Sequence, residues 1–288
     1  MIDAWIGPFL EFDFMRRALV GTIAIAIGSG PVGVFLMLRR MSLTGDAMAH
    51  AILPGAALGY LLAGLSLPAM TLGGLAAGIV VAVAAGLVSR FTALKEDASL
   101  AAFYLLSLAL GVTIVSLRGS NVDLLHVLFG TVLALDDATL LLLAAIATVT
   151  LLTLAVLWRP LVLECVDPAF LRSVSRSGAV AHLVFLGLVV LNLVGGFHAL
   201  GTLLAVGMMM LPAAAARFWT ADITLMMAWS VAIGILSGAL GLLLSYHAEL
   251  PAGPAIILVA GGFYVLSLAF GREGGLLWLA LPRRHLEA

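Results

Sequence analysis

The chain has 288 residues, of which 63% are hydrophobic and 10% are charged, and its formal net charge at pH 7 is −1. Soluble domains carry about 25% charged residues, so this composition excludes an ordinary soluble domain and indicates a protein embedded in lipid. The chain has no basic arm, so nucleic acid is not expected as a partner.

The N-terminal segment has no features of a cleavable signal. Asp3, Glu11 and Asp13 precede the first apolar stretch, which then runs too long for the apolar part of a signal peptide. Cys165 is the only cysteine, so an internal disulfide and a cluster of thiolate metal ligands are both excluded.

Long apolar stretches then recur to the end of the chain. They cover residues 18–38, 48–65, 68–88, 99–117, 138–157, 179–194, 199–216, 223–244 and 253–270. A spanning helix needs about 20 apolar residues, and two of the stretches are short enough to be re-entrant. They lack the alternation typical of barrel strands. We therefore predict an all-α fold, a polytopic transmembrane helical bundle with about nine spans, or eight if one stretch is re-entrant. Residues 1–288 would form a single transmembrane domain.

The basic residues predict the orientation of the bundle. With nine spans, alternate loops collect eleven of the fourteen Lys and Arg residues, and the opposite side holds only Arg16, Arg17 and Arg118. The positive-inside rule then places the N-terminus outside and the C-terminus in the cytoplasm. The pairs Gly55/Gly59, Gly74/Gly78 and Gly234/Gly238 have GxxxG spacing, which we interpret as close helix packing.

Asp46 and His50 form the most informative pair. Side chains four residues apart share one face of a helix, with Cβ atoms about 5–6 Å apart. A carboxylate and an imidazole so placed can share one divalent cation. Alternatively, Asp46 caps the start of its helix and His50 is a hydrogen-bonded packing residue.

The loop at 159–178 is the second informative segment. Asp167 and Pro168 predict the start of a short helix, and Gly178 its end. This amphipathic cytoplasmic helix would carry Phe170, Leu171, Arg172 and Arg176. It is either a surface linker or a docking element, since an apolar anchor with basic flanks suits a groove on another protein.

Other polar residues are weaker candidates. His198, His247 and Glu249 lie in tight connections on the predicted outer side and could guide a metal ion inward. We interpret Asp123, His126, Asp136 and Asp137 as residues of the outer rim, and His182 as a structural residue. Met208, Met209 and Met210 are expected in the core, and Pro212 is expected to bend its helix.

Four parts of the chain carry a family resemblance. The first part, 38–55, contains Arg39-Arg40, Gly45-Asp46-Ala47 and His50-Ala51-Ile52-Leu53-Pro54-Gly55. The others are 95–98 with 109–111, then 125–130, and finally 201–204 with 211–216 and 251–254. Together they resemble the membrane permease of bacterial ATP-binding cassette (ABC) importers for zinc, manganese or iron. Ala49 stands where that family usually has Ser.

The resemblance implies a multi-subunit importer in the bacterial cytoplasmic (inner) membrane, with no resident cofactor. Two permease copies would form the pathway within membrane lipid, as a homodimer. A soluble ATPase dimer would dock on the 167–178 coupling helix, and an extracytoplasmic binding protein would deliver metal. The chain has no GxxxxGK[ST] phosphate loop, so we expect no enzymatic activity from it alone.

Symmetry sharpens the site hypothesis. If two copies pair about the pore axis, two Asp46 and two His50 converge. Such a set suits Zn²⁺, or Mn²⁺ and Fe²⁺ with added waters. The Leu53-Pro54-Gly55 continuation is more similar to the manganese and iron members of the family.

Alternative functions remain open at this point. A permease for siderophores or cobalamin shares the general plan but should lack a converging Asp–His pair. An ion-coupled secondary transporter would place carboxylates near mid-membrane, and the nine apolar cores contain neither Asp nor Glu. An intramembrane metalloprotease would need a motif such as HExxH, which does not occur.

Overall fold

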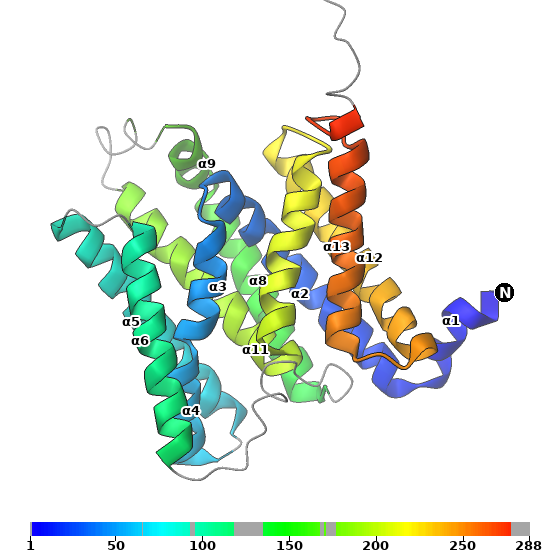
Figure 1. Cartoon of the computed structure of the whole chain (residues 1–288), viewed down its shortest axis with the longest axis horizontal. Helices are drawn as coiled ribbons and strands as arrows, with labels where there is room; N and C mark the ends of the chain where they lie inside the picture. Colours follow the sequence, from blue (N-terminus) through cyan, green and yellow to red (C-terminus); the bar gives the residue numbers. More distant parts are fainter. Residues whose placement is uncertain are drawn as a thin grey trace, which may run out of the picture.

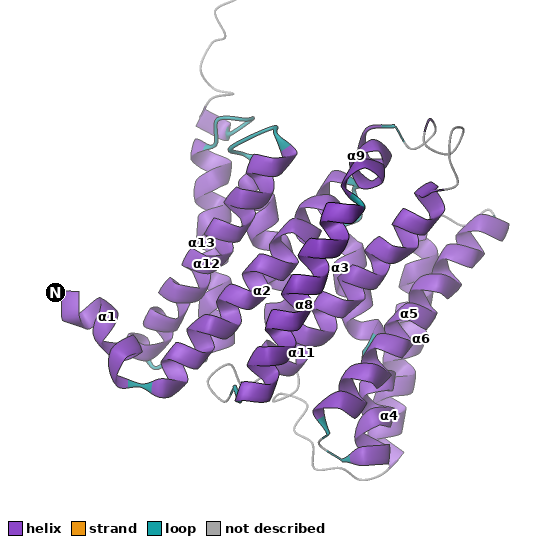
Figure 2. Cartoon of the chain, turned by 180° about the vertical axis from the view of Figure 1, so that it is seen from behind, coloured by secondary structure: helices purple, strands orange, loops and turns teal. Residues whose placement is uncertain are grey.

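The computed structural model describes residues 2–64, 66–92, 96–117, 135–167, 170 and 177–277, and all regular elements in these ranges are helices (Figure 2). In chain order they are α1 (Ile2–Glu11), α2 (Asp13–Leu38), α3 (Ser42–Ala51), α4 (Leu53–Ala63), α5 (Leu67–Phe91), α6 (Glu96–Leu117), α8 (Asp137–Val156), α9 (Trp158–Val166), α11 (Ser177–Arg217), α12 (Ile223–Ala248) and α13 (Ala252–Phe270). The predicted all-α membrane bundle is confirmed.

Seven segments of the described chain are long and apolar enough to cross a membrane. They are Asp13–Leu38, Ser42–Ala63, Leu67–Val88, Asp137–Val156, Val180–Phe197, Ile223–Ala248 and Ala252–Phe270. The other two expected stretches form shorter apolar helices, Ala98–Ile114 and Gly201–Arg217. Each of the nine predicted stretches is therefore helical, and seven of them meet the length of a span.

The helices run between two ends of the bundle (Figure 1). At one end, which we name the α9 end, α2 closes, α3 begins and α9 lies; at the other, the α4 end, α4 lies and α2 begins. Arg39, Arg217 and Arg272 follow or close helices at the α9 end, whereas Arg16 and Arg17 open α2 at the α4 end. The described arginines thus divide between the ends as the sequence predicted.

Glycine lets the helices of this bundle approach closely. Gly33 of α2 lies against the Met209 carbonyl of α11, with no room for a Cβ atom. A Cβ atom at Gly234 would lie 2.9 Å from the Ala26 Cβ, and one at Gly238 would lie 2.8 Å from the Thr22 Oγ1. Small residues therefore hold α2 against both α11 and α12.

The two remaining GxxxG pairs also pack within the chain. Gly55 and Gly59 of α4 lie against the backbone of α5, and Gly74 and Gly78 of α5 lie against Ile52 and Val190. These contacts confirm the interpretation of the GxxxG spacing as helix packing.

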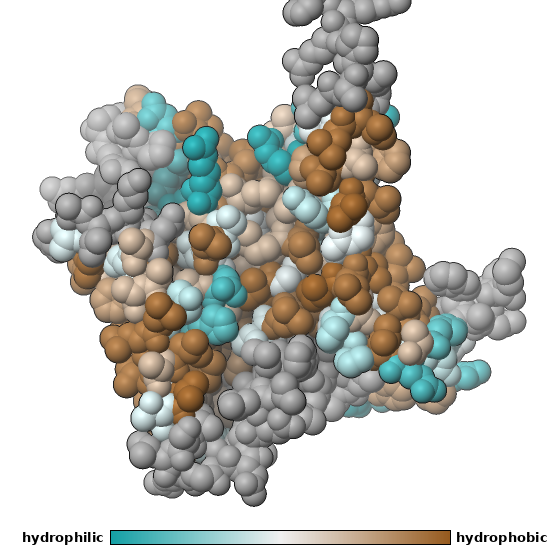
Figure 3. Space-filling model, viewed as in Figure 1, coloured by the Kyte–Doolittle hydropathy of each residue, from teal (hydrophilic) through white to brown (hydrophobic). Residues whose placement is uncertain are grey.

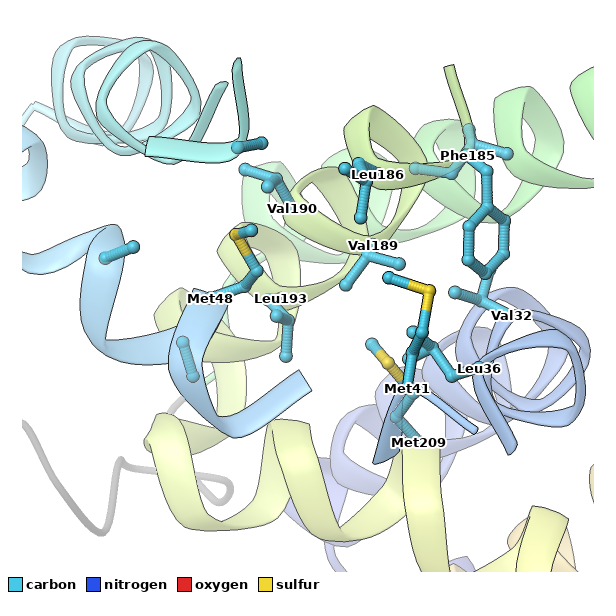
Figure 4. Close-up of a cluster of buried hydrophobic side chains, with 14 of the residues drawn as sticks. Val32, Leu36, Met41, Met48, Phe185, Leu186, Val189, Val190, Leu193 and Met209 are labelled. Atoms are coloured by element: carbon cyan, nitrogen blue, oxygen red, sulfur yellow. The ribbon is translucent and has the colours of Figure 1, made fainter. Parts of the chain in front are cut away.

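An apolar core anchors α3 at the centre of the bundle. Figure 4 shows Met48 of α3 among side chains of α11, with Met41 and Met209 nearby. Met48 and Met209 are fully buried, as is Met208 in a neighbouring cluster. This burial confirms core packing for Met208 and Met209. It also fixes one face of α3 against α11, whereas Ser42, Leu43 and Asp46 of the same helix are exposed.

Helix α11 is broken at Gly201, three residues after the connection that was expected at His198. Gly201 has φ 80° and ψ 168°, and Pro212 remains inside the helix. Because a positive φ is accessible to glycine at little cost, the chain reverses there at the α4 end and returns (Figure 1). Pro212 lies in the interior of the returning part of α11, where proline removes one backbone hydrogen bond and favours a bend.

Candidate metal site and its surroundings

Asp46 and His50 lie one turn apart on α3, as predicted. The His50 Nε2 is 3.8 Å from the Asp46 Oδ1, which is beyond hydrogen-bond distance. The Asp46 side chain is 63% exposed and that of His50 is 26% exposed. The two donor atoms therefore face each other without a direct hydrogen bond and are accessible from outside the chain.

Asp46 does not cap its helix. Helix α3 begins at Ser42 with Met41 at the cap position, and no side chain provides a cap hydrogen bond there. Asp46 is the fifth residue of α3, beyond the first turn, where the exposed N–H groups of a helix end. The alternative reading of Asp46 as a capping residue is therefore wrong.

The His50 ring is held by an aromatic neighbour. Tyr104 of α6 stacks on it, with ring centroids 5.9 Å apart and planes at 30°. The His50 Nδ1 is buried and has no hydrogen-bond partner among the described residues. The stack orients the ring so that Nε2, on the Asp46 side, is the nitrogen that remains available to a ligand.

The span that contains this pair is interrupted just after His50. Helix α3 ends at Ala51, and α4 begins at Leu53 with Pro54 in its first turn. The Ser107 Oγ of α6 donates a hydrogen bond of 3.1 Å to the Ala51 carbonyl, one of the carbonyls near the break. A helix C-terminus carries partial negative charge, so the break makes the surroundings of His50 more favourable to a cation.

The open face of α3 lies near the middle of the bundle. Figure 3 shows apolar surface between the two ends, with a hydrophilic area near mid-height over α3. At 1.5 Å per residue, His50 lies about 12 Å along α3 from its start at Ser42. Leu43, one turn before Asp46, is 75% exposed, so apolar surface adjoins the polar pair.

The predicted coupling segment is described only in part. The Asp167 Oδ1 accepts a hydrogen bond of 2.9 Å from the Phe170 N–H, which is the geometry of a helix N-cap, and Phe170 is exposed. Gly178 is the second residue of α11 and does not end the preceding helix, because its backbone continues as helix. Pro168, Leu171, Arg172 and Arg176 lie outside the described residues.

The outer candidates lie apart from the Asp46–His50 pair, at the α4 end. The His247 Nδ1 is 2.9 Å from the Leu243 carbonyl oxygen of its own helix. Glu249 is exposed and adopts φ 52°, closing α12. His198 lies in α11, and its side chain is outside the described residues, as are Asp123 and His126.

Two residues of the predicted outer rim, Asp136 and Asp137, stabilise local structure at the α4 end. The Asp136 Oδ1 accepts a hydrogen bond from the Thr139 N–H at the start of α8, and these Thr139 contacts lower the Asp136 pKa. Asp137 pairs with Arg17 across 3.2 Å.

Sequence reasoning missed three contributors to the site region. Tyr104 and Ser107 come from α6, about 55 residues after the pair, and no local pattern marks them. The third is a buried ionic cluster at the α9 end, in which His182 contacts Arg39 and Glu164. The one signal in the sequence near Tyr104 and Ser107 was Pro54, because proline marks the break between α3 and α4 that these two residues adjoin.

Comparison with known proteins assigns the family. The model of the ABC 3 transport family matches residues 11–271. The manganese import system permease protein ScaB of Streptococcus parasanguinis is 33% identical over 93% of this chain and 94% of its own length. A protein of Haemophilus influenzae named as a probable iron transport system membrane protein is 30% identical over 93% of this chain and 97% of its own length.

A solved structure supports the same assignment. The structure of PsaBC from Streptococcus pneumoniae in complex with Fab aligns with a TM-score of 0.85 at 30% identity, covering 97% of this chain and 99% of that one. The predicted permease, rather than an enzyme, is confirmed, as is a multi-pass protein of the bacterial cytoplasmic membrane. The chain belongs to the ABC 3 transport family.

Proposed function

We propose that this chain is the permease of an ABC importer that moves divalent manganese or iron into the cytoplasm through a site formed by Asp46 and His50. The observation that carries the proposal is the open Asp46–His50 pair on α3, about 6 and 12 Å along the helix from its start at the α9 end. A carboxylate at the centre of a spanning helix costs about 2.5–3.5 kcal/mol on insertion scales, so an exposed carboxylate within a span is expected to serve the transport pathway.

We infer nine crossings from the arrangement of the helices. Helices Ala98–Ile114 and Gly201–Arg217 are shorter than a full span, yet each runs between the two ends of the bundle (Figure 1). Together with the seven longer segments they give nine passes. The arginines at the α9 end then make this end cytoplasmic by the positive-inside rule.

A second copy of the chain supplies the remaining ligands. One chain offers one carboxylate and one imidazole, and the described residues hold no group of three or more His, Cys, Asp or Glu side chains able to hold a metal ion. Two copies facing each other through the open side of α3 would offer two of each donor. The apolar surface at Leu43 beside the pair suits such a contact.

The donor set favours manganese or iron, with zinc as the third candidate. Oxygen and imidazole donors suit Mn²⁺ and Fe²⁺, and waters would complete the coordination of either ion. Cys165 is on α9 and provides no thiolate to the pair, which argues against a soft ion. The manganese and iron names of the relatives support the same order.

Two partners complete the importer. A cytoplasmic ATPase dimer would dock at the α9 end, with Asp167, Phe170 and the residues up to Gly178 forming the coupling segment. A metal-binding protein would dock at the α4 end, where His198, His247 and Glu249 could guide the ion.

Transport by proteoliposomes tests the proposal. Vesicles holding the permease, its ATPase and its binding protein should import radioactive manganese when ATP is on the ATPase side. The Asp46→Asn and His50→Gln variants should lose import and retain ATP hydrolysis, and Glu273→Gln, an exposed glutamate at the α9 end, should behave as wild type. Import that persists in both site variants would refute the site.

The same vesicles separate the alternative functions. A chelate permease would import a ferric siderophore or cobalamin and would be insensitive to Asp46→Asn. An ion-coupled carrier would import metal under a proton gradient without the ATPase. Either result would replace the proposed function.

A further inference from the structure

A buried ionic cluster joins three helices at the α9 end. The Arg39 Nη2 donates a hydrogen bond of 2.9 Å to the Glu164 Oε1 and also contacts the His182 Nδ1. The side chains of Arg39 and Glu164 are only 8% and 15% exposed. Arg39 follows α2, Glu164 belongs to α9 and His182 to α11, so the cluster ties together elements that lie far apart in the sequence.

Aromatic contacts make the same junction rigid. Phe35 of α2 meets Trp158 of α9 and Phe185 of α11 edge to face, with ring centroids 5.9 and 6.2 Å apart. The Arg39 guanidinium lies 5.0 Å from the centre of the Phe185 ring. We call these side chains, together with Glu164 and His182, the α2–α9–α11 junction. Close packing of this kind transmits displacement instead of absorbing it.

The junction lies between the ATPase-facing segment and the metal site. Glu164 precedes Asp167, the start of the coupling segment, by three residues. Arg39 precedes Asp46 by seven residues, across a tight connection in which Arg40 has φ 59°. The Met41 N–H bonds to the Leu36 carbonyl across 2.8 Å in this connection. Movement of Arg39 must therefore move the start of α3.

The ionic pair is only half formed. The Arg39 Nη1 and the Glu164 Oε2 are both buried without a hydrogen-bond partner among the described residues. Arginine and carboxylate groups commonly form two parallel hydrogen bonds, and buried polar atoms without partners cost free energy. A small movement of α9 against α2 would join these two atoms, so the junction has a second arrangement available to it.

We propose that Arg39 and Glu164 are positioning residues for transport, which carry the movement of α9 to α3 and thereby open or close the Asp46–His50 site. This inference rests on the proposed function, because it needs an ATPase to move α9. The half-formed pair in the present structure is one end of the movement, and the two-bond pair is the other.

The ratio of manganese imported to ATP hydrolysed tests the proposal. Glu164→Gln weakens the pair with little change of shape, and Arg39→Met/Glu164→Leu replaces a buried ion pair by apolar side chains, an exchange that is often neutral for folding. Both variants should lower the ratio by about fivefold or more, the size of a coupling free energy between sites, and keep ATP hydrolysis. The ratio of Glu273→Gln should remain that of wild type. Wild-type ratios in both junction variants would overturn the proposal.

Cys165 gives a second measurement that does not depend on transport. It is the only cysteine of the chain and is next to Glu164, and burial raises its pKa to about 11. If α9 moves, the thiol becomes more solvated, and a fall of one pKa unit raises its thiolate fraction about tenfold. Alkylation of Cys165, followed by mass spectrometry of the permease, should differ between nucleotide-free and ATP-trapped complexes.

The outcomes separate this inference from the function on which it rests. In wild type the alkylation rate should change about tenfold on trapping, and Glu164→Gln should remove most of the change. Equal rates in the two wild-type states would overturn the inference. If that happens while Asp46→Asn still abolishes import, only the inference fails; if Asp46→Asn imports normally, the proposed function itself fails.

Discussion

The Asp46–His50 pair and the α2–α9–α11 junction lie on either side of the α2–α3 connection and are built in opposite ways. The carboxylate of Asp46 is largely exposed and has no direct hydrogen bond to His50. The charges of Arg39 and Glu164 are buried, bonded to each other and packed among aromatic rings. Both regions contain an acid and a base, but only in the second do the acid and the base form a direct hydrogen bond.

This difference separates a structural link from a transport site. Buried charges need partners inside the protein, so the junction ties helices together at the cost of desolvation. Among the described residues the α3 pair has no partner of this kind, and under the proposed function a cation held with a second copy of the chain would stabilise its exposed carboxylate. Changes at the junction should therefore alter folding and coupling, and changes at the pair should alter transport alone.

The largest effect on stability should come from breaking the junction on one side. Arg39→Ala leaves the Glu164 carboxylate buried without its cation, and the loss should be about 3–5 kcal/mol in the free energy of unfolding. Thermal unfolding in detergent should show a large fall for Arg39→Ala and little change for Arg39→Met/Glu164→Leu. A single variant as stable as wild type would mean that Arg39 and Glu164 are not a buried pair.

The next effect should be on metal affinity at the open pair. Tyr104→Ala removes the ring that orients His50, and groups that orient a metal ligand typically contribute 10- to 100-fold, so we expect manganese binding about tenfold weaker. Tyr104→Phe keeps the ring and should bind nearly as wild type. Titration of the assembled complex in nanodiscs measures both. Equal affinities for the two variants would show that the stack has no role in binding.

A smaller effect is expected at the break between α3 and α4. Ser107→Ala leaves the Ala51 carbonyl without its donor, which should cost about 1 kcal/mol. Thr113→Ala on the same helix is the matched control, because the Thr113 Oγ1 donates to the Ala109 carbonyl of its own exposed turn. Chemical denaturation compares the two. An equal loss of unfolding free energy in both variants would show that the Ser107 hydrogen bond does not specifically stabilise the break between α3 and α4.

The smallest stability effect should belong to the residue that matters most for transport. Asp46→Asn changes an exposed side chain that lies 3.8 Å from His50, beyond hydrogen-bond distance, so the free energy of unfolding should stay within about 0.5 kcal/mol of wild type. Thermal unfolding of the same preparation used for transport checks this. A marked loss of stability would place Asp46 with the structural residues and remove the contrast with Arg39.

Several features of the structure could be predicted from patterns of neighbouring residues in the sequence. The apolar stretches predicted the helices, since a segment in lipid must satisfy its own backbone hydrogen bonds. The spacing of Asp46 and His50 predicted their shared face, and Asp167 predicted the cap that Phe170 confirms. Each of these depends on residues within one or two turns of each other.

Other features required the packed chain. The expected helix end at Gly178 is wrong, because Gly178 lies inside α11, and the break of α11 is at Gly201, three residues after the connection expected at His198. Sequence patterns place helix ends only to within a few residues, because packing decides which turn is the last. Tyr104 could not be paired with His50 in advance, since the crossing of α6 and α3 sets that contact.

The sequence by itself determined the lipid environment, the helical class, the positions of the apolar segments and the local geometry of the Asp46–His50 pair. These depend on composition and on hydrogen bonds within a helix, which are properties of neighbouring residues. Only the tertiary structure decided that Arg39 meets Glu164 and His182, that Tyr104 covers His50 and that Asp46 remains open. Those outcomes arise from the close packing of helices distant in sequence, in which small residues such as Gly33 set how near two backbones can come.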